Sequence, residues 1–282
     1  MLKKRPITSY IFTALIALTA AFVTYYCSGH LKIYSGNSRD LIHAIRSRDL
    51  FTLFIGVPLL LLTGFMALRR SNRAYLVWVG ILAYFMTTYL WYAAGIAYNQ
   101  FFLIYVALFT LSFFAFIRAL FALDAEEFCL RFSPKTPVRF AALIMFGGGL
   151  LLAYLWLNPL LPALKAGSQP DLLHCYGSTS LIHLVLNLGV VSPLAIITSL
   201  WIWKGKPWGY ITVSILLFYG LTINLIFLTS QWFSYNLGNP DMQGIIVSGA
   251  ITMLILILYM VFLKNLREEI IRDHRNRITS LV

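Results

Sequence analysis

Charged residues are scarce in this sequence. Only 11% of the 282 residues are Asp, Glu, Lys or Arg, whereas about 25% is usual for a soluble domain. A water-soluble globule is therefore excluded. The apolar residues, 60% of the chain, instead form runs of about 19 to 24 residues, the length that a helix needs to cross ~30 Å of hydrocarbon. Because almost none of them shows the alternating ten-residue pattern of an outer-membrane barrel, the sequence predicts helices.

The apolar runs predict an all-α integral membrane protein with eight transmembrane helices. We expect these helices at residues 9–27, 50–68, 74–97, 101–123, 140–157, 179–203, 208–229 and 245–263. Residues 1–139 then hold helices one to four, residues 140–264 hold helices five to eight, and residues 265–282 form a basic cytoplasmic tail.

The basic residues are distributed unevenly between the two sides of these helices. The net charge is +12, and with the N-terminus in the cytoplasm 17 of the 22 Lys and Arg residues fall inside. Such a bias is typical of proteins of the bacterial inner membrane, because positively charged loops stay on the cytoplasmic side. An even number of helices then places both termini in the cytoplasm. Topology and attraction to anionic membrane lipids explain the excess positive charge, so no nucleic-acid partner is predicted.

The first apolar run resembles a secretory signal, because basic residues at 3–5 precede it. It continues to about Val23, however, which is longer than a typical signal core. Bulky Tyr25 and Tyr26 precede Cys27, where a lipoprotein signal requires small residues. We therefore expect this run to remain in the protein as the first helix. Cleavage would leave a protein with seven transmembrane helices.

An internal repeat is predicted at a shift of 135 residues. Residues 58–90 align without a gap on residues 193–225, and eight of the 33 columns are identical. The identities include Pro, Thr and Tyr pairs, which composition alone explains poorly. We interpret helices one to four and five to eight as a 4+4 tandem repeat. Because each unit has an even number of helices, the copies would insert in the same direction, related by a pseudo-twofold axis along the membrane normal.

One proline of each copy falls at the same place, Pro58 in helix two and Pro193 in helix six. Each removes a backbone hydrogen bond from its helix, so both helices are expected to kink. Structural symmetry and a functional hinge both account for the match, and the sequence does not decide between them.

Acidic residues are missing from every predicted helix. Asp40, Asp49, Asp171 and Asp241 fall on the outer side, and the other six fall on the cytoplasmic side. Proton- and sodium-driven transporters usually keep an ionisable group inside the membrane. Coupled transport is therefore disfavoured.

Neutral polar residues do occur within the predicted helices, and they gather in the outer halves. In lipid each of them needs a partner, so we expect them to point inward. Two interpretations stay open: hydrogen bonds that hold the bundle together, and a ligand site between the two copies that opens to the outside. On the second interpretation the ligand-binding residues are Tyr84, Thr87, Tyr92, His183, Asn187, Tyr219, Thr222, Asn224 and Arg48.

Donor atoms for metals also gather on the outer side. Cys27 and His30 are close in sequence, and His174 adjoins Cys175. Imidazole and thiolate bind zinc, copper or haem iron, but this spacing matches no standard zinc module. Alternatively, Cys27 and Cys175 form a disulfide or stay free thiols. No cofactor is predicted, and a metal or haem is the weaker alternative.

A four-residue pattern occurs twice before the second apolar run. Ser-Arg-Asp-Leu at residues 38–41 recurs at residues 47–50. A serine cap followed by an aspartate stabilises the start of a helix, so each copy predicts an N-terminus: first of a short surface helix, then of the second transmembrane helix. Basic residues such as Arg48 are uncommon in segments on the outer side of the membrane. Arg48 either holds a lipid phosphate or an anionic substrate at the mouth of the site, or is solvated or paired.

No catalytic motif is present. The sequence lacks the G-x-S-x-G, H-E-x-x-H, Walker, dinucleotide-binding and C-x-x-C patterns, and close helix packing explains the three glycines at 147–149. The leading hypothesis is a multi-pass inner-membrane protein that binds or translocates a small amphipathic or lipid-like molecule, with membrane lipids around it. One alternative is a membrane enzyme that uses His183, His174 and Arg48 at the outer face. Another is a scaffold or sensor subunit beside other membrane subunits.

Overall fold

The computed structural model describes residues 7–168, 181–236 and 242–267. Within these ranges, eight helices are long and apolar enough to cross a membrane, so the chain is a multi-pass, all-α membrane protein. The crossing helices are α1 (Ile7–Gly29), α2–η2–α3 (Arg39–Phe51, Thr52–Gly56, Val57–Leu68), α4 (Asn72–Gly95), α5 (Phe102–Ala122), α7 (Val138–Ala166), α9–η3–α10 (Ile182–Leu186, Asn187–Val191, Ser192–Trp203), α11 (Pro207–Asn236) and α12 (Met242–Asn265). Two short helices, η1 (Leu31–Tyr34) and α6 (Ala125–Cys129), lie in the connections.

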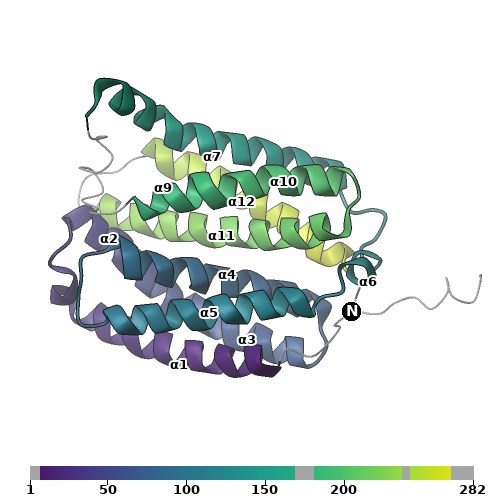
Figure 1. Cartoon of the computed structure of the whole chain (residues 1–282), viewed down its shortest axis with the longest axis horizontal. Coiled ribbons are helices and arrows are strands. Elements are labelled where there is room, and N and C mark those ends of the chain that lie inside the picture. The colour runs from purple at the N-terminus through teal and green to yellow at the C-terminus, as the bar shows by residue number, and fades with distance from the viewer. Residues whose placement is uncertain (1–6, 169–180, 237–241, 268–282) are drawn as a thin grey trace, which may run out of the picture.

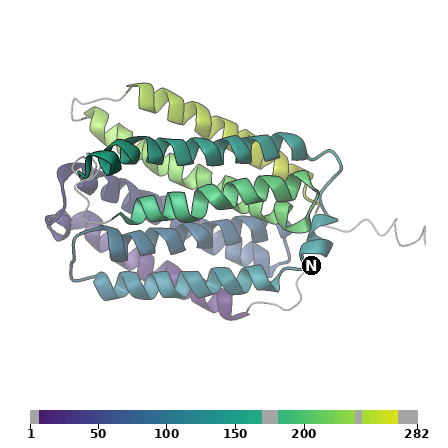
Figure 2. The same cartoon turned by 45° about the horizontal axis from the view of Figure 1, so that its top comes forward.

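The crossing helices form two halves that lie side by side (Figures 1 and 2). Helices α1 to α5 make the first half and α7 to α12 the second, and α4 packs against α11 between them. α4 is buried along most of its length, whereas large apolar side chains such as Phe54, Leu103 and Ile246 are exposed on the outer helices. An apolar exterior suits contact with lipid tails, which are as apolar as leucine.

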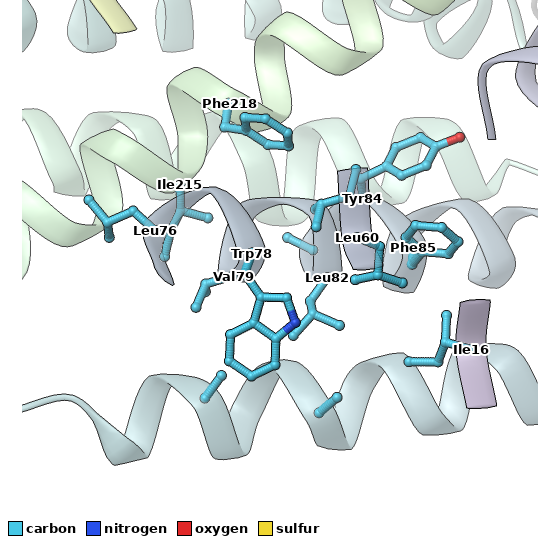
Figure 3. Close-up of a cluster of buried hydrophobic side chains, with 14 of the residues drawn as sticks. Ile16, Leu60, Leu76, Trp78, Val79, Leu82, Tyr84, Phe85, Ile215 and Phe218 are labelled. Carbon is cyan, nitrogen blue, oxygen red and sulfur yellow. The ribbon is translucent and has the colours of Figure 1, made fainter. Parts of the chain in front are cut away.

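The contact between the halves depends on a residue without a side chain. Gly80 of α4 faces Phe218 of α11, and a Cβ atom at position 80 would lie 2.7 Å from Cδ1 of that ring. Figure 3 shows Phe218 lying over α4 within the buried cluster. Small residues at helix crossings let two helices approach closely, which is a main source of association in lipid.

The glycines at 147–149 differ in their packing. A Cβ atom on Gly149 would lie 3.1 Å from the carbonyl oxygen of Ser192, while one on Gly147 or Gly148 would meet nothing within 4 Å. The hydroxyl of Ser192 donates to the carbonyl of Gly149 at 2.6 Å. Close helix packing therefore accounts for Gly149, between α7 and α10, and not for the other two.

The end of the bundle at which α1 begins is closed by backbone hydrogen bonds. Ser133 N–H donates to the carbonyl of Asn265 at 2.9 Å, and Arg267 N–H donates to the carbonyl of Arg131 at 3.0 Å. The Arg73 side chain donates to the carbonyl of Leu266 at 3.0 Å. The connection before α7 and the segment after α12 are thus held together at this end, which is called the N-terminal end below.

The second crossing helix differs from the sequence prediction. α2 begins at Arg39, where the Ser38 hydroxyl accepts the backbone N–H of Leu41 as expected of a cap. The helix then continues through Ser47, Arg48 and Asp49 without a second start, and the Ser47 hydroxyl donates to the carbonyl of His43 within the helix. The prediction of a separate surface helix is therefore wrong, because α2 is the first part of the span Arg39–Leu68.

Both matched prolines follow a π-helical turn. Thr52–Gly56 (η2) ends two residues before Pro58, and Asn187–Val191 (η3) ends two residues before Pro193. In each case the N–H just before the proline bonds to a carbonyl five residues earlier. The wider turn leaves room for the proline ring, which clashes with the preceding turn of a regular helix. The disturbance expected at these prolines therefore takes the form of a π-helical turn.

The turns that follow α3 and α10 also correspond at the shift of 135 residues. Positive φ angles occur at Arg70 (71°) and Gly205 (65°). Backbone N–H groups of residues 69, 70 and 71 bond to the carbonyls of 65, 67 and 66, and those of 204, 205 and 206 bond to 200, 202 and 201. A left-handed residue after the last helical turn commonly ends a helix in this way. The local backbone geometry of the two segments is thus alike at each of these positions.

Candidate functional site

The second crossing helix contains aspartates, whereas the sequence predicts no acidic residue within any crossing helix. Asp49 belongs to the crossing helix Arg39–Leu68 and is 2% exposed. About 20 helical residues cross the hydrocarbon, so a count back from Leu68 at the N-terminal end places Asp49 near the opposite boundary. A buried carboxylate at this boundary is a candidate functional group, because ionisable residues at the membrane are costly and are retained mainly for function.

Two tyrosines hold the Asp49 carboxylate. Tyr34 of η1 donates its hydroxyl to Oδ2 at 2.9 Å, and Tyr92 of α4 donates to Oδ1 at 2.6 Å. Burial raises the pKa of Tyr34, so its hydroxyl stays protonated and remains a donor. Each carboxylate oxygen therefore has a donor, and the three residues tie the connection after α1 to α2 and α4. We call Tyr34, Asp49 and Tyr92 the Asp49 network.

A second pair of hydroxyls joins the same two helices one turn away. Thr52 and Tyr84 lie 2.6 Å apart through their oxygen atoms, and Tyr84 is fully buried. On the other side of the network, the Cys27 sulfur is 3.9 Å from the hydroxyl of Tyr105. The Thr52–Tyr84 contact and the Asp49 network fix the rotation of α2, because polar groups that are buried in a membrane bundle must find partners within it.

Rotation of α2 determines the position of Arg48, the neighbour of Asp49. The guanidinium carbon of Arg48 lies 4.3 Å from the centre of the Trp91 ring, a cation–π arrangement. Arg48 is half-buried, and its Nε atom is fully buried without a hydrogen-bond partner. Within the described ranges, no acidic side chain forms an ion pair with it. The buried Nε donor of the guanidinium is thus unused.

Side chains from the second half complete this cluster. The imidazole of His183 on α9 is 5.0 Å from the Trp91 ring, measured between ring centres. Tyr219 of α11 is close enough to interact with both Arg48 and the side chain of Thr87 on α4. Four helices from both halves thus meet here. We call Arg48, Thr87, Trp91, His183 and Tyr219 the Arg48 cluster.

The predicted ligand-binding residues separate into two groups. The structure brings Arg48, Thr87, His183 and Tyr219 together, with Tyr84 and Tyr92 beside them. The other three bond to their own helices: Asn187 to the carbonyl of His183 at 2.9 Å, Thr222 to that of Tyr219 at 2.7 Å, and Asn224 to that of Gly220 at 2.9 Å. Thr87 likewise bonds to its own helix, to the carbonyl of Ala83 at 3.0 Å, but it also interacts with Tyr219. No such contact links Asn187, Thr222 or Asn224 to the cluster among the described residues.

The weak metal candidates do not assemble among the described residues. Cys27 is buried and forms no disulfide with another described residue, and a ring nitrogen of His30 pairs with the carbonyl of Tyr26 at 3.0 Å. His174 and Cys175 lie outside the described residues, so the predicted disulfide stays a prediction. In the ranges that the structure describes, no three His, Cys, Asp or Glu side chains are grouped as a metal site requires.

Sequence reasoning missed Asp49 and Tyr34 and gave Trp91 no role. A signal was present for Asp49, because Leu41, Ile45 and Asp49 follow one another at four-residue spacing and are all buried. The aspartate therefore shares the inward face of two apolar residues. No comparable pattern marks Tyr34, whose partner is 15 residues away in a different helix.

Comparison with known protein families, characterised proteins and solved structures gives no match. The function must therefore be argued from the geometry of this chain.

Proposed function

We propose that this protein binds or translocates a small amphipathic or lipid-like molecule at the Arg48 cluster. The observation that supports this most directly is the set of unused donors where the two halves meet. Nε of Arg48 and Nε1 of Trp91 are both buried without a hydrogen-bond partner. Such groups are rare in native proteins and costly in a membrane, so a ligand that accepts hydrogen bonds accounts for them better than a bundle held together only by its own contacts.

The orientation follows the distribution of charge. The basic residues at 69–73, 131–139 and 204–206 lie in turns at the N-terminal end, and positively charged loops stay in the cytoplasm. We therefore place the protein in the bacterial inner membrane with both termini inside. The Arg48 cluster then lies toward the outer face, within reach of the outer leaflet.

In the proposed 4+4 tandem repeat, the Arg48 cluster lies at the interface between the two copies. The shared π-helical turns, prolines and helix ends support the repeat. At the shift of 135 residues Arg48 corresponds to His183, and Tyr84 corresponds to Tyr219. The equivalent helices α4 and α11 pack against each other, so the pseudo-twofold axis would pass between them. Ligand sites at the interface between repeats are usual in transporters that are built from repeats.

The test is untargeted mass spectrometry of the molecules that co-purify with the protein in mild detergent. Tyr219→Phe and His183→Leu remove polar groups from the cluster and should deplete a molecule that the unmodified protein retains. Tyr210→Phe is a matched control, because Tyr210 is on the same helix but packs 5.1 Å from Phe132, between ring centres, at the N-terminal end.

Identical sets of retained molecules in all four proteins, at equal abundance and stability, would exclude the cluster as a ligand site. Bound metal or haem in the purified protein would instead favour a membrane enzyme, and stable co-purification of another membrane subunit would favour a scaffold or sensor.

A further inference from the structure

We infer that the ligand carries an anionic oxygen group, a phosphate or a carboxylate, and that Arg48 is the residue that holds it. This inference rests on the proposed function, because it concerns the same cluster. It specifies the chemistry of the part of the ligand that lies nearest to α2.

The guanidinium of Arg48 has unused donors. Arginine has five N–H groups and no acceptor. Asp49 is close enough to act on Arg48 electrostatically, but its two oxygens accept from Tyr34 and Tyr92. No hydrogen bond joins the Arg48 guanidinium to another described residue, and its Nε is buried. An oxygen anion from outside the chain would use these donors.

The guanidinium of Arg48 is also held in place. It lies 4.3 Å from the centre of the Trp91 ring, and the Asp49 network anchors the helix that carries it. A planar fork with a fixed orientation matches the two oxygens of a carboxylate or phosphate, and little side-chain freedom is lost on binding. The positioning residues are thus Asp49 and Trp91.

The cluster contains a second buried group that can only donate. Nε1 of Trp91 can only donate, and it too is buried without an acceptor. His183 and Tyr219 can each donate as well. A cationic head group would find an arginine here and no free carboxylate, since Asp49 is occupied. The cluster therefore selects for negative charge.

The depth of Arg48 allows two sources for such an anion. It lies next to Asp49, near the boundary of the hydrocarbon, where the head group of an outer-leaflet lipid would be found. A free anion from the aqueous side would reach the same level. Both sources present the same oxygen chemistry, and the experiment below separates them.

The test compares two lipids that differ only in the phosphate. Native mass spectrometry of the full chain in dodecyl maltoside would measure retention of added dioleoyl phosphatidate and of dioleoylglycerol. The unmodified protein should retain the phosphatidate preferentially. Arg48→Gln should lower that retention roughly tenfold to hundredfold, as expected for loss of hydrogen bonds to a charged group, and leave dioleoylglycerol unchanged.

Arg39→Gln is the matched control, because Arg39 carries the same charge at the exposed start of the same helix. Its phosphatidate retention should stay that of the unmodified protein. Arg48→Lys keeps the charge but loses the planar fork, so retention should fall between those of the unmodified protein and Arg48→Gln. If Arg48→Gln does not fold, Arg48→Lys decides, and unchanged retention in that variant would overturn the inference.

Inorganic phosphate, added in millimolar excess, separates the sources. Displacement of the phosphatidate by inorganic phosphate would identify a site for a free anion, and no displacement would identify a lipid head group. Equal retention of both lipids, insensitive to Arg48→Gln, would overturn the inference. In that case the proposed function stands if Tyr219→Phe or His183→Leu lowers retention of dioleoylglycerol, and fails with the inference if neither variant does.

Discussion

Removal of one hydroxyl from the Asp49 network should destabilise the protein measurably. In Tyr92→Phe the ring remains, but the donor to Oδ1 of Asp49 at 2.6 Å is lost. The carboxylate is 2% exposed, so water cannot easily replace this donor. The same hydroxyl also lies 3.3 Å from the carbonyl of Ile45, so the variant removes one donor whose shorter contact is with a buried acidic group.

The expected loss follows from two ranges. Hydrogen bonds to charged groups contribute about 1.5–3 kcal/mol in soluble proteins, whereas polar contacts between membrane helices average ~0.6 kcal/mol and reach ~1.7 kcal/mol. The short distance and the burial place this bond at the upper end of the membrane range, at ~1.5 kcal/mol. Since 1 kcal/mol shifts the midpoint of a large domain by about 2–4 °C, thermal unfolding should occur ~3–6 °C lower.

The assay is thermal unfolding in dodecyl maltoside at constant protein and detergent concentration. Tyr98→Phe is the control, because Tyr98 is 84% exposed in the connection after α4 and should unfold as the unmodified protein does. If the loss arises through Asp49, Tyr92→Phe should cost less than ~0.5 kcal/mol in an Asp49→Asn background, since contacting residues are not additive. An unfolding midpoint for Tyr92→Phe equal to that of Tyr98→Phe would refute the reasoning.

Three further results are expected. Gly80→Leu should cost about 1–3 kcal/mol in the same assay because its side chain meets Phe218, and a stable variant would show that the halves do not pack as described. In a cysteine-free background, a cysteine at Lys135 should react in intact cells only with membrane-permeant maleimides, whereas a cysteine at Lys165 should react with impermeant maleimides as well. Impermeant labelling at Lys135 and not at Lys165 would show that the proposed topology is inverted. Cys27, which is 0% exposed, should resist alkylation in the folded protein. After unfolding without reductant, one reactive thiol of the three would indicate the predicted bridge, and three would exclude it.

The number and type of the crossing helices could be predicted from the sequence. In lipid every backbone N–H and C=O must bond within the chain, so an apolar run of about 20 residues has to be a helix. The equivalence of Pro58 and Pro193 was also visible, because proline disturbs a helix in a way that its neighbours must accommodate. These features depend on local chemistry, and local chemistry can be read along the chain.

The identity of the site residues could be predicted from the sequence less well than the helices, because it depends on tertiary contacts. Arg39–Phe51 has three arginines and two aspartates in 13 residues, a composition that indicates a surface helix. Only packing against α4 and α11 shows that one of its faces is buried. The partners of Asp49 come from positions 15 and 43 residues away, and sequence distance carries no information about such contacts.

The sequence by itself determined that this chain lies in a membrane as helices and where those helices turn, because hydrocarbon leaves the backbone no other choice. Tertiary structure alone decided which way the polar residues face. Most of the crossing helices are apolar on all sides and do not reveal their inward face through periodicity. The face of α2 can be read from Leu41 and Ile45, but the position of Arg48 on Trp91, beside an aspartate held by two tyrosines, follows only from how the helices pack.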